Sequence, residues 1–417
     1  VVLALTFGFT LLTTEIAIGR KTGQSPLTAY EQMHKGWGGI GVLACAVPVI
    51  ILPYYCSIGG WVLKYLSAFL TGHGAQAAED GYFTGYITQV GQPIIWMLIY
   101  VLITATVVYK GVNKGIEKYS KILMPILFVL IAGISVFSLT LKHTNADGVT
   151  RTGMQGLAIY LIPNFRGMTV KSFLSVVMDA LGQLFFSISV AMGIMVTYGS
   201  YAKKETNLMK SINQIEFFDT LVALLAGLMI IPAVFAFSGG NPDNLQAGPS
   251  LMFITLPKVF ASMGVGRLAG ILFFILVLLA AVTSAISLLE TSVSTFQDEL
   301  HWSRPKCCIL MVAVMLIIGT LSSMGYGVLS FIQIFGMACL DFFDFLTNSV
   351  MMPLAALATC FLIVRTVGFD KIAREIEQSS AFKRKKLYMF FMKYLAPICL
   401  IIILLSSIAN VLGIISM

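Results

Sequence analysis

The sequence contains few charged residues. Of its 417 residues, 11% are Asp, Glu, Lys or Arg and 58% are hydrophobic, and the mean hydropathy is +0.89. Soluble globular domains keep about a quarter of their residues charged. The composition therefore excludes a soluble enzyme and indicates a polytopic membrane protein.

Motifs for several other functions are also missing. The seven cysteines lie within apolar segments or at their edges, which argues against a disulfide framework. The four histidines are scattered at no metal-ligand spacing. No glycine-rich loop for the phosphates of ATP occurs. Transport by this protein would therefore draw its energy from an ion gradient.

Ten apolar segments are long enough to cross about 30 Å of hydrocarbon. They lie near residues 1–19, 40–70, 92–109, 119–141, 172–202, 214–237, 267–298, 307–324, 328–364 and 389–415. Several are longer than a straight crossing requires, so we expect tilted, kinked or broken helices. The fold class predicted from these segments is an all-α polytopic membrane protein.

Basic residues alternate between successive loops. Nineteen Lys and Arg residues occur in every second loop, as at 110–121 and 365–386, and six occur in the intervening loops. By the positive-inside rule the richer loops are cytoplasmic, and both ends of this sequence are predicted to lie outside. The net charge of +8 follows from this bias and requires no nucleic-acid partner.

The segment 172–201 contains the clearest interruption of an apolar run. Ser187, Ser189 and Gly193 lie near its centre. Lipid cannot satisfy free backbone N–H and C=O groups, so an unwound stretch inside a bilayer must be buried in protein or line a cavity. In transporters such broken helices carry substrate and ion sites. The segment therefore predicts a binding site at membrane depth.

Acidic residues inside the apolar segments are a second signal, because an unpaired charge there is costly. These residues are Glu15, Asp179, Asp219, Glu290, Asp341 and Asp344. They greatly outnumber the basic residues in the same segments, which indicates a cation pathway. We expect Asp179 to lie at a water-exposed helix end, whereas Asp341 fits either position.

Two further polar clusters are open to two interpretations each. Thr283 and Ser284 lie in the middle of an apolar helix, where their hydroxyls either ligate a small cation or bond back to the preceding turn. The motif PYYCSIGGW (53–61) places two tyrosines beside a kink at Pro53. A buried phenol needs a partner, which is either a neighbouring helix or a ligand carboxylate.

Several segments together resemble the neurotransmitter:sodium symporter family, in its bacterial amino-acid transporter form. They are EIAIGRKTGQSPLTAY (15–30), PYYCSIGGW (53–61), LGQLFFSISVAMGIMVTYGSY (181–201), IIPAVFAF (230–237), GPSLMFITLPKVF (248–260), AAVTSAISLLE (280–290) with QDEL (297–300), and DFFDFLTNSVMMPL (341–354). The resemblance implies two inverted five-helix repeats with broken helices, one or two extra helices, and no enzymatic reaction.

The resemblance also implies how the chain is divided. Residues 1–417 would form a single transmembrane domain, with 1–141 as helices two to five of the first repeat, 172–364 as the second repeat and 389–415 as helix eleven. The first helix of the family, with its share of sodium ligands and a gating arginine, has no counterpart in this sequence. We expect that helix to lie upstream of Val1.

Individual roles follow from the same resemblance. Residues matching the substrate site are Ile51, Tyr55, Phe186, Ser189, Met192, Ser284 and Leu288. Residues matching the sodium sites are Ser187 and Asp219 for the first ion, and Ala280, Thr283 and Ser284 for the second. Residues matching the gates are Asp344 at the outer side and Tyr201 and Asp298 at the inner side.

The function implied is sodium-coupled symport of a neutral hydrophobic amino acid by alternating access. The pocket walls are apolar, and the carboxylate of Asp219, at a position where many members have asparagine, implies chloride independence. Monoamines stay open as substrates. We expect a plasma-membrane location, sodium as the co-transported ion and no organic cofactor. The alternatives are an ion channel and a truncated membrane protein that does not transport; the sequence leaves the oligomeric state open.

Overall fold

Helices form nearly all of the structure. The computed structural model describes residues 1–144, 148–163, 165, 167–237 and 248–411. Eight helices in this part of the chain are long and apolar enough to span a membrane, namely Gly38–Leu70, Gly91–Tyr109, Lys114–Thr140, Leu208–Phe237, Gly266–Leu300, Arg304–Met324, Cys339–Val367 and Lys385–Ala409. The predicted all-α polytopic fold is confirmed, with one short hairpin added.

The remaining elements are short or interrupted. They are η1 (Ala4–Gly8), α1 (Phe9–Thr22), α2 (Pro26–Met33), α4 (Gly74–Ala77), α5 (Tyr82–Ile87), α8 (Gly153–Leu161), α9 (Val170–Ser187), α10 (Ile194–Ser200), α12 (Gly248–Ser250), η4 (Leu251–Thr255), α13 (Leu256–Ala261), α18 (Phe369–Glu377), and the paired strands β1 (Lys142–Thr144) and β2 (Thr150–Thr152). Together η1 and α1 form the first apolar segment, and α9 and α10 form the interrupted one.

α3 (Gly38–Leu70) lies at the centre of the bundle. It packs against α14 (Gly266–Leu300), α6 (Gly91–Tyr109) and α15 (Arg304–Met324). A Cβ at Gly60 would lie 2.6 Å from the backbone nitrogen of Met97 on α6, so glycine allows the two backbones to approach. The most hydrophobic window of α3 is 61% buried within the protein.

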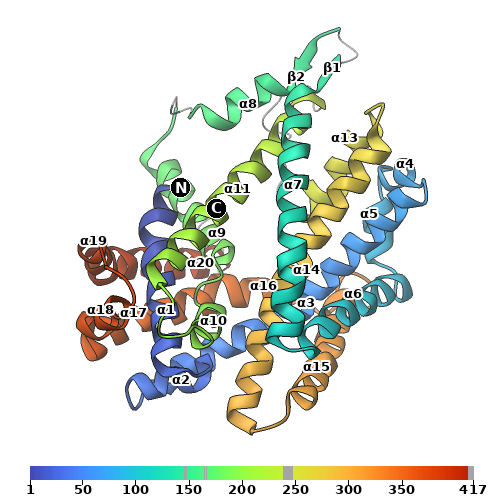
Figure 1. Cartoon of the computed structure of the whole chain (residues 1–417). Helices are drawn as coiled ribbons and strands as arrows, with labels where there is room; N and C mark the ends of the chain where they lie inside the picture. Colours follow the sequence, from blue (N-terminus) through green and yellow to red (C-terminus); the bar gives the residue numbers. More distant parts are fainter. Residues whose placement is uncertain (145–147, 164, 166, 238–247, 412–417) are drawn as a thin grey trace.

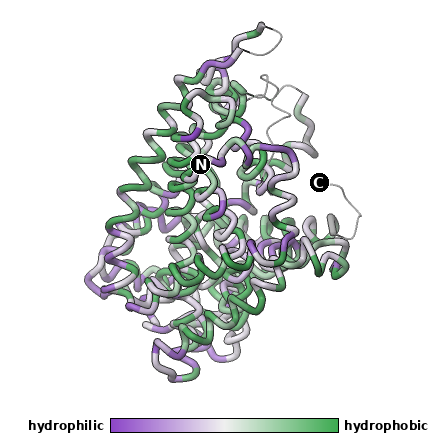
Figure 2. The backbone as a smooth tube through the Cα atoms, turned by 90° about the vertical axis from the view of Figure 1, so that its right-hand side faces the viewer, coloured by the Kyte–Doolittle hydropathy of each residue, from purple (hydrophilic) through white to green (hydrophobic). Residues whose placement is uncertain are grey.

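Other spans lie at the periphery. In the span that η2 (Val112–Glu117) and α7 (Lys118–Thr140) form, the most hydrophobic window is only 22% buried, and Val129 is 73% exposed. Figure 2 shows that hydrophobic residues follow the long helices, while hydrophilic ones gather mainly in connecting segments. An apolar helix surface without a protein neighbour is the surface that lipid covers.

The two sets of loops lie at opposite ends of the molecule. In Figure 1, the hairpin, α13 and α4 lie at one end, and α2 and the α14–α15 connection lie at the other. At the first end Lys258 pairs with Asp80 at 2.5 Å. At the second, the Arg304 guanidinium donates to the Val108 carbonyl at 2.9 Å. This separation agrees with the alternation of charge along the sequence.

The predicted segment 328–364 begins later than expected. Its helical span starts with α16 (Cys339–Asp344) and continues through η5 (Phe345–Met351), α17 (Met352–Phe361) and η6 (Leu362–Val367). Residues before it turn back at Phe335 and Gly336, both with positive φ, where Ile334 and Met337 form an isolated bridge. Hydropathy alone does not detect this turn. The final span consists of α19 (Lys385–Phe390), η7 (Phe391–Leu395) and α20 (Ala396–Val411).

Candidate functional site

A helix breaks where the sequence predicts it. α9 ends at Ser187 and α10 starts at Ile194. Ser189 and Ala191 adopt positive φ values of 54° and 62°, which L-residues rarely occupy outside functional or tightly held segments. The residues between the two helices include Val190 and Met192, and both are buried. The unwound backbone is thus enclosed by protein.

Gly193 completes the break and is required there for two reasons. Its φ is +73°, a conformation that costs other residues free energy. A Cβ at this position would also lie 2.7 Å from Cγ of Pro26 and 3.2 Å from the carbonyl oxygen of Ala44. α2 and α3 therefore pack directly against the break.

Glu15 anchors the unwound segment from α1. Its Oε1 accepts a hydrogen bond of 2.6 Å from the backbone N–H of Ala191. The side chain is almost fully buried, and its Oε2 has no hydrogen-bond partner among the described residues. The carboxylate thus supplies a partner for a backbone donor that the helix break releases.

An oxygen pair lies at the end of α9. The Ser187 hydroxyl donates to Oδ1 of Asp219, on α11 (Leu208–Phe237), at 2.6 Å. Both residues are partly buried. Hydroxyl and carboxylate oxygens are the hard ligands that small cations prefer. The two residues predicted for the first sodium ion are therefore adjacent.

A second oxygen group lies on α14. The Thr283 hydroxyl donates to the carbonyls of Ala280 at 2.9 Å and Leu279 at 3.1 Å. This bond within the helix is the ordinary behaviour of threonine, and it holds the Thr283 and Ala280 oxygens side by side. Ser284 follows on the exposed side of the same turn.

An apolar cavity of about 380 Å³ lies beside these oxygens, between α3, α7, α11 and α14. Tyr55, Ala280 and Ser284 line it, together with Met229 and Phe273. The hydroxyls of Tyr55 and Ser284 are the polar side-chain groups of its lining. The cavity thus combines an apolar wall with a few converging polar groups, which is the usual character of a small-molecule site.

The other predicted substrate residues are divided between the core and a second cavity. Ile51, Met192 and Leu288 are buried in the core. Phe186 and Asp344 line a separate cavity of about 470 Å³, which also includes Asp179, Gln183, Asn348 and Ser406. The structure therefore brings Phe186 to the outer-gate acid and not to the cavity of Tyr55.

Asp344, the predicted outer-gate acid, has neutral partners. It accepts hydrogen bonds from the Tyr54 hydroxyl at 3.1 Å and the Asn348 amide at 2.6 Å. Tyr54 is itself buried. The two tyrosines of the PYY motif therefore diverge: Tyr55 lines the apolar cavity, and Tyr54 contacts the gate.

The predicted inner-gate residues do not contact each other. The Tyr201 hydroxyl donates to Glu290 at 2.7 Å, and Glu290 is also paired with Arg304. Asp298 instead accepts a hydrogen bond of 2.8 Å from the backbone N–H of Ser25. The inner end thus contains two separate contacts, one made by Tyr201 and one by Asp298.

Comparisons with known proteins agree with this geometry. The family model described as "Sodium:neurotransmitter symporter family" matches residues 82–414. The chain belongs to the sodium:neurotransmitter symporter family. It is a multi-pass membrane transporter that is coupled to sodium and moves a small molecule, and it is not an enzyme.

Relatives of this symporter come from distant organisms. A protein named "Uncharacterized sodium-dependent transporter YhdH" from Bacillus subtilis (strain 168) is 34% identical, over 100% of this chain and 89% of its own length. An uncharacterized sodium-dependent transporter from Haemophilus influenzae is 29% identical, over 97% and 88%. The solved structure titled "Crystal structure of MhsT in complex with L-phenylalanine" has a TM-score of 0.83 at 33% identity, covering 96% of this chain and 88% of that one.

Three residues of the symporter were not assigned a site role from the sequence. Glu15 and Glu290 were recognised only as acids within apolar segments, and Tyr54 only as one of two tyrosines. The sequence could have marked each of them as a candidate, because a buried carboxylate or phenol needs a partner. Apart from Arg304, which is 14 residues from Glu290, the partners lie far away along the chain and follow only from the fold.

Proposed function

We propose that this symporter transports neutral hydrophobic amino acids together with sodium, by alternating access. The observation that carries the proposal is the apolar cavity of about 380 Å³ in which Tyr55 and Ser284 are among the few polar side chains. A hydrophobic side chain fits such a wall, and the Tyr55 phenol is a donor suited to a carboxylate. The solved relative in complex with L-phenylalanine supports this class of substrate.

The proposed substrate site extends from this cavity toward the broken helix. Ile51 and Leu288 lie about one turn from Tyr55 and Ser284 on α3 and α14, and Met192 lies in the break. Met192 is flexible, so it adapts to side chains of different size. Ser189 would present its carbonyl to the substrate amine, and Phe186 would move over the cavity as its lid.

The proposed ion sites use the two oxygen groups. Ser187 and Asp219 would ligate the first sodium, and Ala280, Thr283 and Ser284 the second. Each inward charge gains about 2.3 kcal/mol from 100 mV of membrane potential, so one or two sodium ions suffice for strong accumulation in a plasma membrane. We further assign 1–141 and 172–364 to the two repeats and 389–415 to the additional helix.

Chloride independence is part of the proposal. A bound cation needs a compensating negative charge in a medium of low dielectric. Asp219 supplies a fixed carboxylate 2.6 Å from the Ser187 hydroxyl. A transporter with this charge in place requires no chloride ion at the site.

The gates would alternate around these sites. Asp344, held by Tyr54, lies at the predicted outer end, and Tyr201 and Asp298 lie at the predicted inner end. Closure of the outer gate and opening of the inner gate would release sodium and substrate inward.

The test is uptake into proteoliposomes. We expect an inward sodium gradient to drive accumulation of radiolabelled L-phenylalanine or L-leucine, and a potassium gradient of equal size to drive none. Accumulation of a basic amino acid in preference to these substrates would overturn the proposed substrate class.

A further inference from the structure

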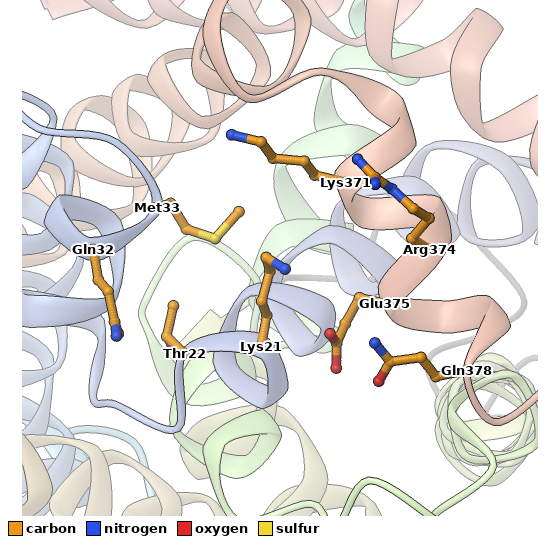
Figure 3. A pocket seen from close by; sticks show the side chains of 8 residues that line it. All are labelled: Lys21, Thr22, Gln32, Met33, Lys371, Arg374, Glu375 and Gln378. Carbon is orange, nitrogen blue, oxygen red and sulfur yellow. The ribbon is translucent and has the colours of Figure 1, made fainter.

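A polar pocket of about 500 Å³ lies far from the substrate cavity, at the predicted cytoplasmic end. Its walls come from the last turn of α1, from α2 and from α18. Figure 3 shows the lining side chains arranged around one hollow, with Lys21 on α1 facing Lys371 and Arg374 on α18. The proposed transport chemistry does not use this pocket.

Three cationic groups of this pocket have no carboxylate partner in the part of the chain that the structure describes. Among the described residues, no Asp or Glu oxygen lies within 4.0 Å of the charged nitrogens of Lys21, Lys371 or Arg374. The Arg374 Nε donates only to the Asp370 carbonyl of its own helix, at 3.3 Å. All three side chains belong to exposed residues.

The carboxylate in the pocket wall is already neutralised from the other side. Glu375 accepts a hydrogen bond from Arg20 at 2.9 Å and another from Lys204 at 2.9 Å. Burial alone would raise the pKa of Glu375, but Lys204 and Arg20 lower it below its ordinary value. Glu375 therefore remains ionised and bound to these two cations, which leaves the charge of Lys21, Lys371 and Arg374 uncompensated.

The orientation of α18 fixes two of these cations in place. Ile372 and Ile376 are fully buried, so the opposite face of this short helix is held toward the pocket. Lys371 and Arg374 are three residues apart, a spacing at which like charges on a helix repel each other. An anion between them and Lys21 would remove that repulsion.

The pocket lies at the level expected of lipid headgroups. α18 begins two residues after the span that ends at Val367, and Lys21 lies in the last turn of α1. Basic residues directly beyond membrane spans attract anionic headgroups of the cytoplasmic leaflet. We propose that this pocket binds a phosphate-bearing anion, and its position favours the headgroup of an anionic phospholipid over a soluble phosphate.

Binding there would link the pocket to the transport machinery. The anion would join α1 to α18 beside the buried Arg20–Glu375 pair. The loop that follows Lys21 leads to Ser25, whose backbone N–H holds the inner-gate residue Asp298. Occupancy would therefore stabilise the arrangement in which the inner end is packed as observed.

The test measures binding to the full chain purified in detergent. Short-chain phosphatidylglycerol, short-chain phosphatidylcholine and inorganic phosphate are titrated separately, and both the affinity and the midpoint of thermal unfolding are recorded. We expect saturable binding and stabilisation by phosphatidylglycerol and none by phosphatidylcholine. Saturable binding of inorganic phosphate alone would support the same pocket with a soluble ligand.

Variants test whether the three cations form a specific binding pocket or act only through the general positive charge of the surface. K371Q/R374Q should bind phosphatidylglycerol roughly 30-fold more weakly, because each basic group near an anionic surface contributes about a factor of five. K21Q, on a different helix, should lose about fivefold. The matched control K114Q/K118Q removes two exposed cations from another predicted cytoplasmic loop and should stay within twofold of wild type.

Two results would overturn the proposal. One is equal affinity of wild type and K371Q/R374Q for phosphatidylglycerol, with both proteins eluting as single folded species. The other is the absence of saturable binding for both phosphatidylglycerol and inorganic phosphate. Neither result affects the uptake assay for the proposed substrate, so the two proposals fail separately.

Discussion

Carboxylates at the predicted cytoplasmic end differ from those at the helix break and the outer gate in the partners they meet. At the cytoplasmic end three buried acids are each paired with an arginine, in the pairs Arg20–Glu375, Arg304–Glu290 and Arg384–Glu216. At the helix break and the outer gate the acids meet neutral donors, namely the Ala191 N–H at Glu15, the Ser187 hydroxyl at Asp219, and Tyr54 with Asn348 at Asp344. The inner-gate acid Asp298 follows the second pattern, with the Ser25 N–H.

This difference separates two uses of the same side chain. A carboxylate that is already paired with arginine has little remaining attraction for a cation, so the paired acids act as scaffold. A carboxylate with neutral donors keeps its charge available, and in a low-dielectric site that charge favours sodium. The acids predicted for the ion site and the gates all belong to this second group.

Breaking a scaffold pair should have the largest effect on stability. Arg304→Met would leave Glu290, which is fully buried, without its cationic partner, at a cost of about 3–5 kcal/mol. The measurement is unfolding of the purified protein in detergent. Lys121→Met is the control, since the Lys121–Glu117 pair is exposed and should contribute about 0–1 kcal/mol. Equal losses of unfolding free energy in the two variants would contradict the distinction between buried and exposed pairs.

Straining the broken helix should have the next largest effect. Gly193→Ala places a Cβ against Pro26 at a residue with φ of +73°, which costs about 1–3 kcal/mol. It would also disturb the backbone that presents the Ala191 N–H to Glu15, so sodium-driven uptake should fall with it. Gly133→Ala on α7 meets nothing within 4 Å and should leave uptake unchanged. Unimpaired uptake in Gly193→Ala would show that transport does not depend on this geometry.

Removing a neutral donor at the outer gate should have a smaller effect. Tyr54→Phe deletes the hydrogen bond to Asp344, which is worth about 1 kcal/mol. We therefore expect substrate to dissociate roughly fivefold faster from the outward side. Tyr100→Phe is the control, because the buried Tyr100 hydroxyl has no partner among the described residues. If Tyr100→Phe had an effect as large as that of Tyr54→Phe, the assignment of Tyr54 to the outer gate would be contradicted.

The smallest predicted change is in how the stability of one scaffold pair, Arg20–Glu375, depends on acid pH. Burial tends to raise the pKa of Glu375, but Lys204 and Arg20 lower it below the ordinary value of 4.5. A lowered pKa in the folded state stabilises the protein above pH 4.5, and this contribution is lost as pH falls through the folded-state pKa. The Glu375→Gln variant should therefore lose less unfolding free energy than wild type as the pH falls below 4.5. An unchanged pH profile would show that the pairing is weak.

Much of the fold follows from local features of the sequence. The lengths of the apolar segments predicted the membrane spans. The break at Ser187–Gly193 was also predictable, because polar and small residues interrupt an apolar run there. The late start of the span at Cys339 was not visible, since Phe335 lies in an apolar run and its positive φ is a property of the folded chain.

The contacts among the predicted site residues were only partly predictable from the sequence. Ser187 and Asp219, both predicted for the first sodium ion, are in contact, whereas the contact of Tyr201 with Glu290 was not predicted. Tyr201 and Glu290 lie on different helices, so the register between α10 and α14 decides which acid the phenol meets. Such a register depends on packing across the whole bundle, which residue patterns along one helix do not contain.

The central claim is that Asp219 supplies the charge for the first sodium ion. The direct measurement is sodium-dependent uptake of L-phenylalanine by the transporter in proteoliposomes, with chloride replaced by gluconate, in wild type and Asp219→Asn. The account predicts that wild-type uptake is unchanged without chloride, and that Asp219→Asn requires chloride or a sodium concentration at least tenfold higher. Loss of wild-type uptake on chloride removal would contradict it.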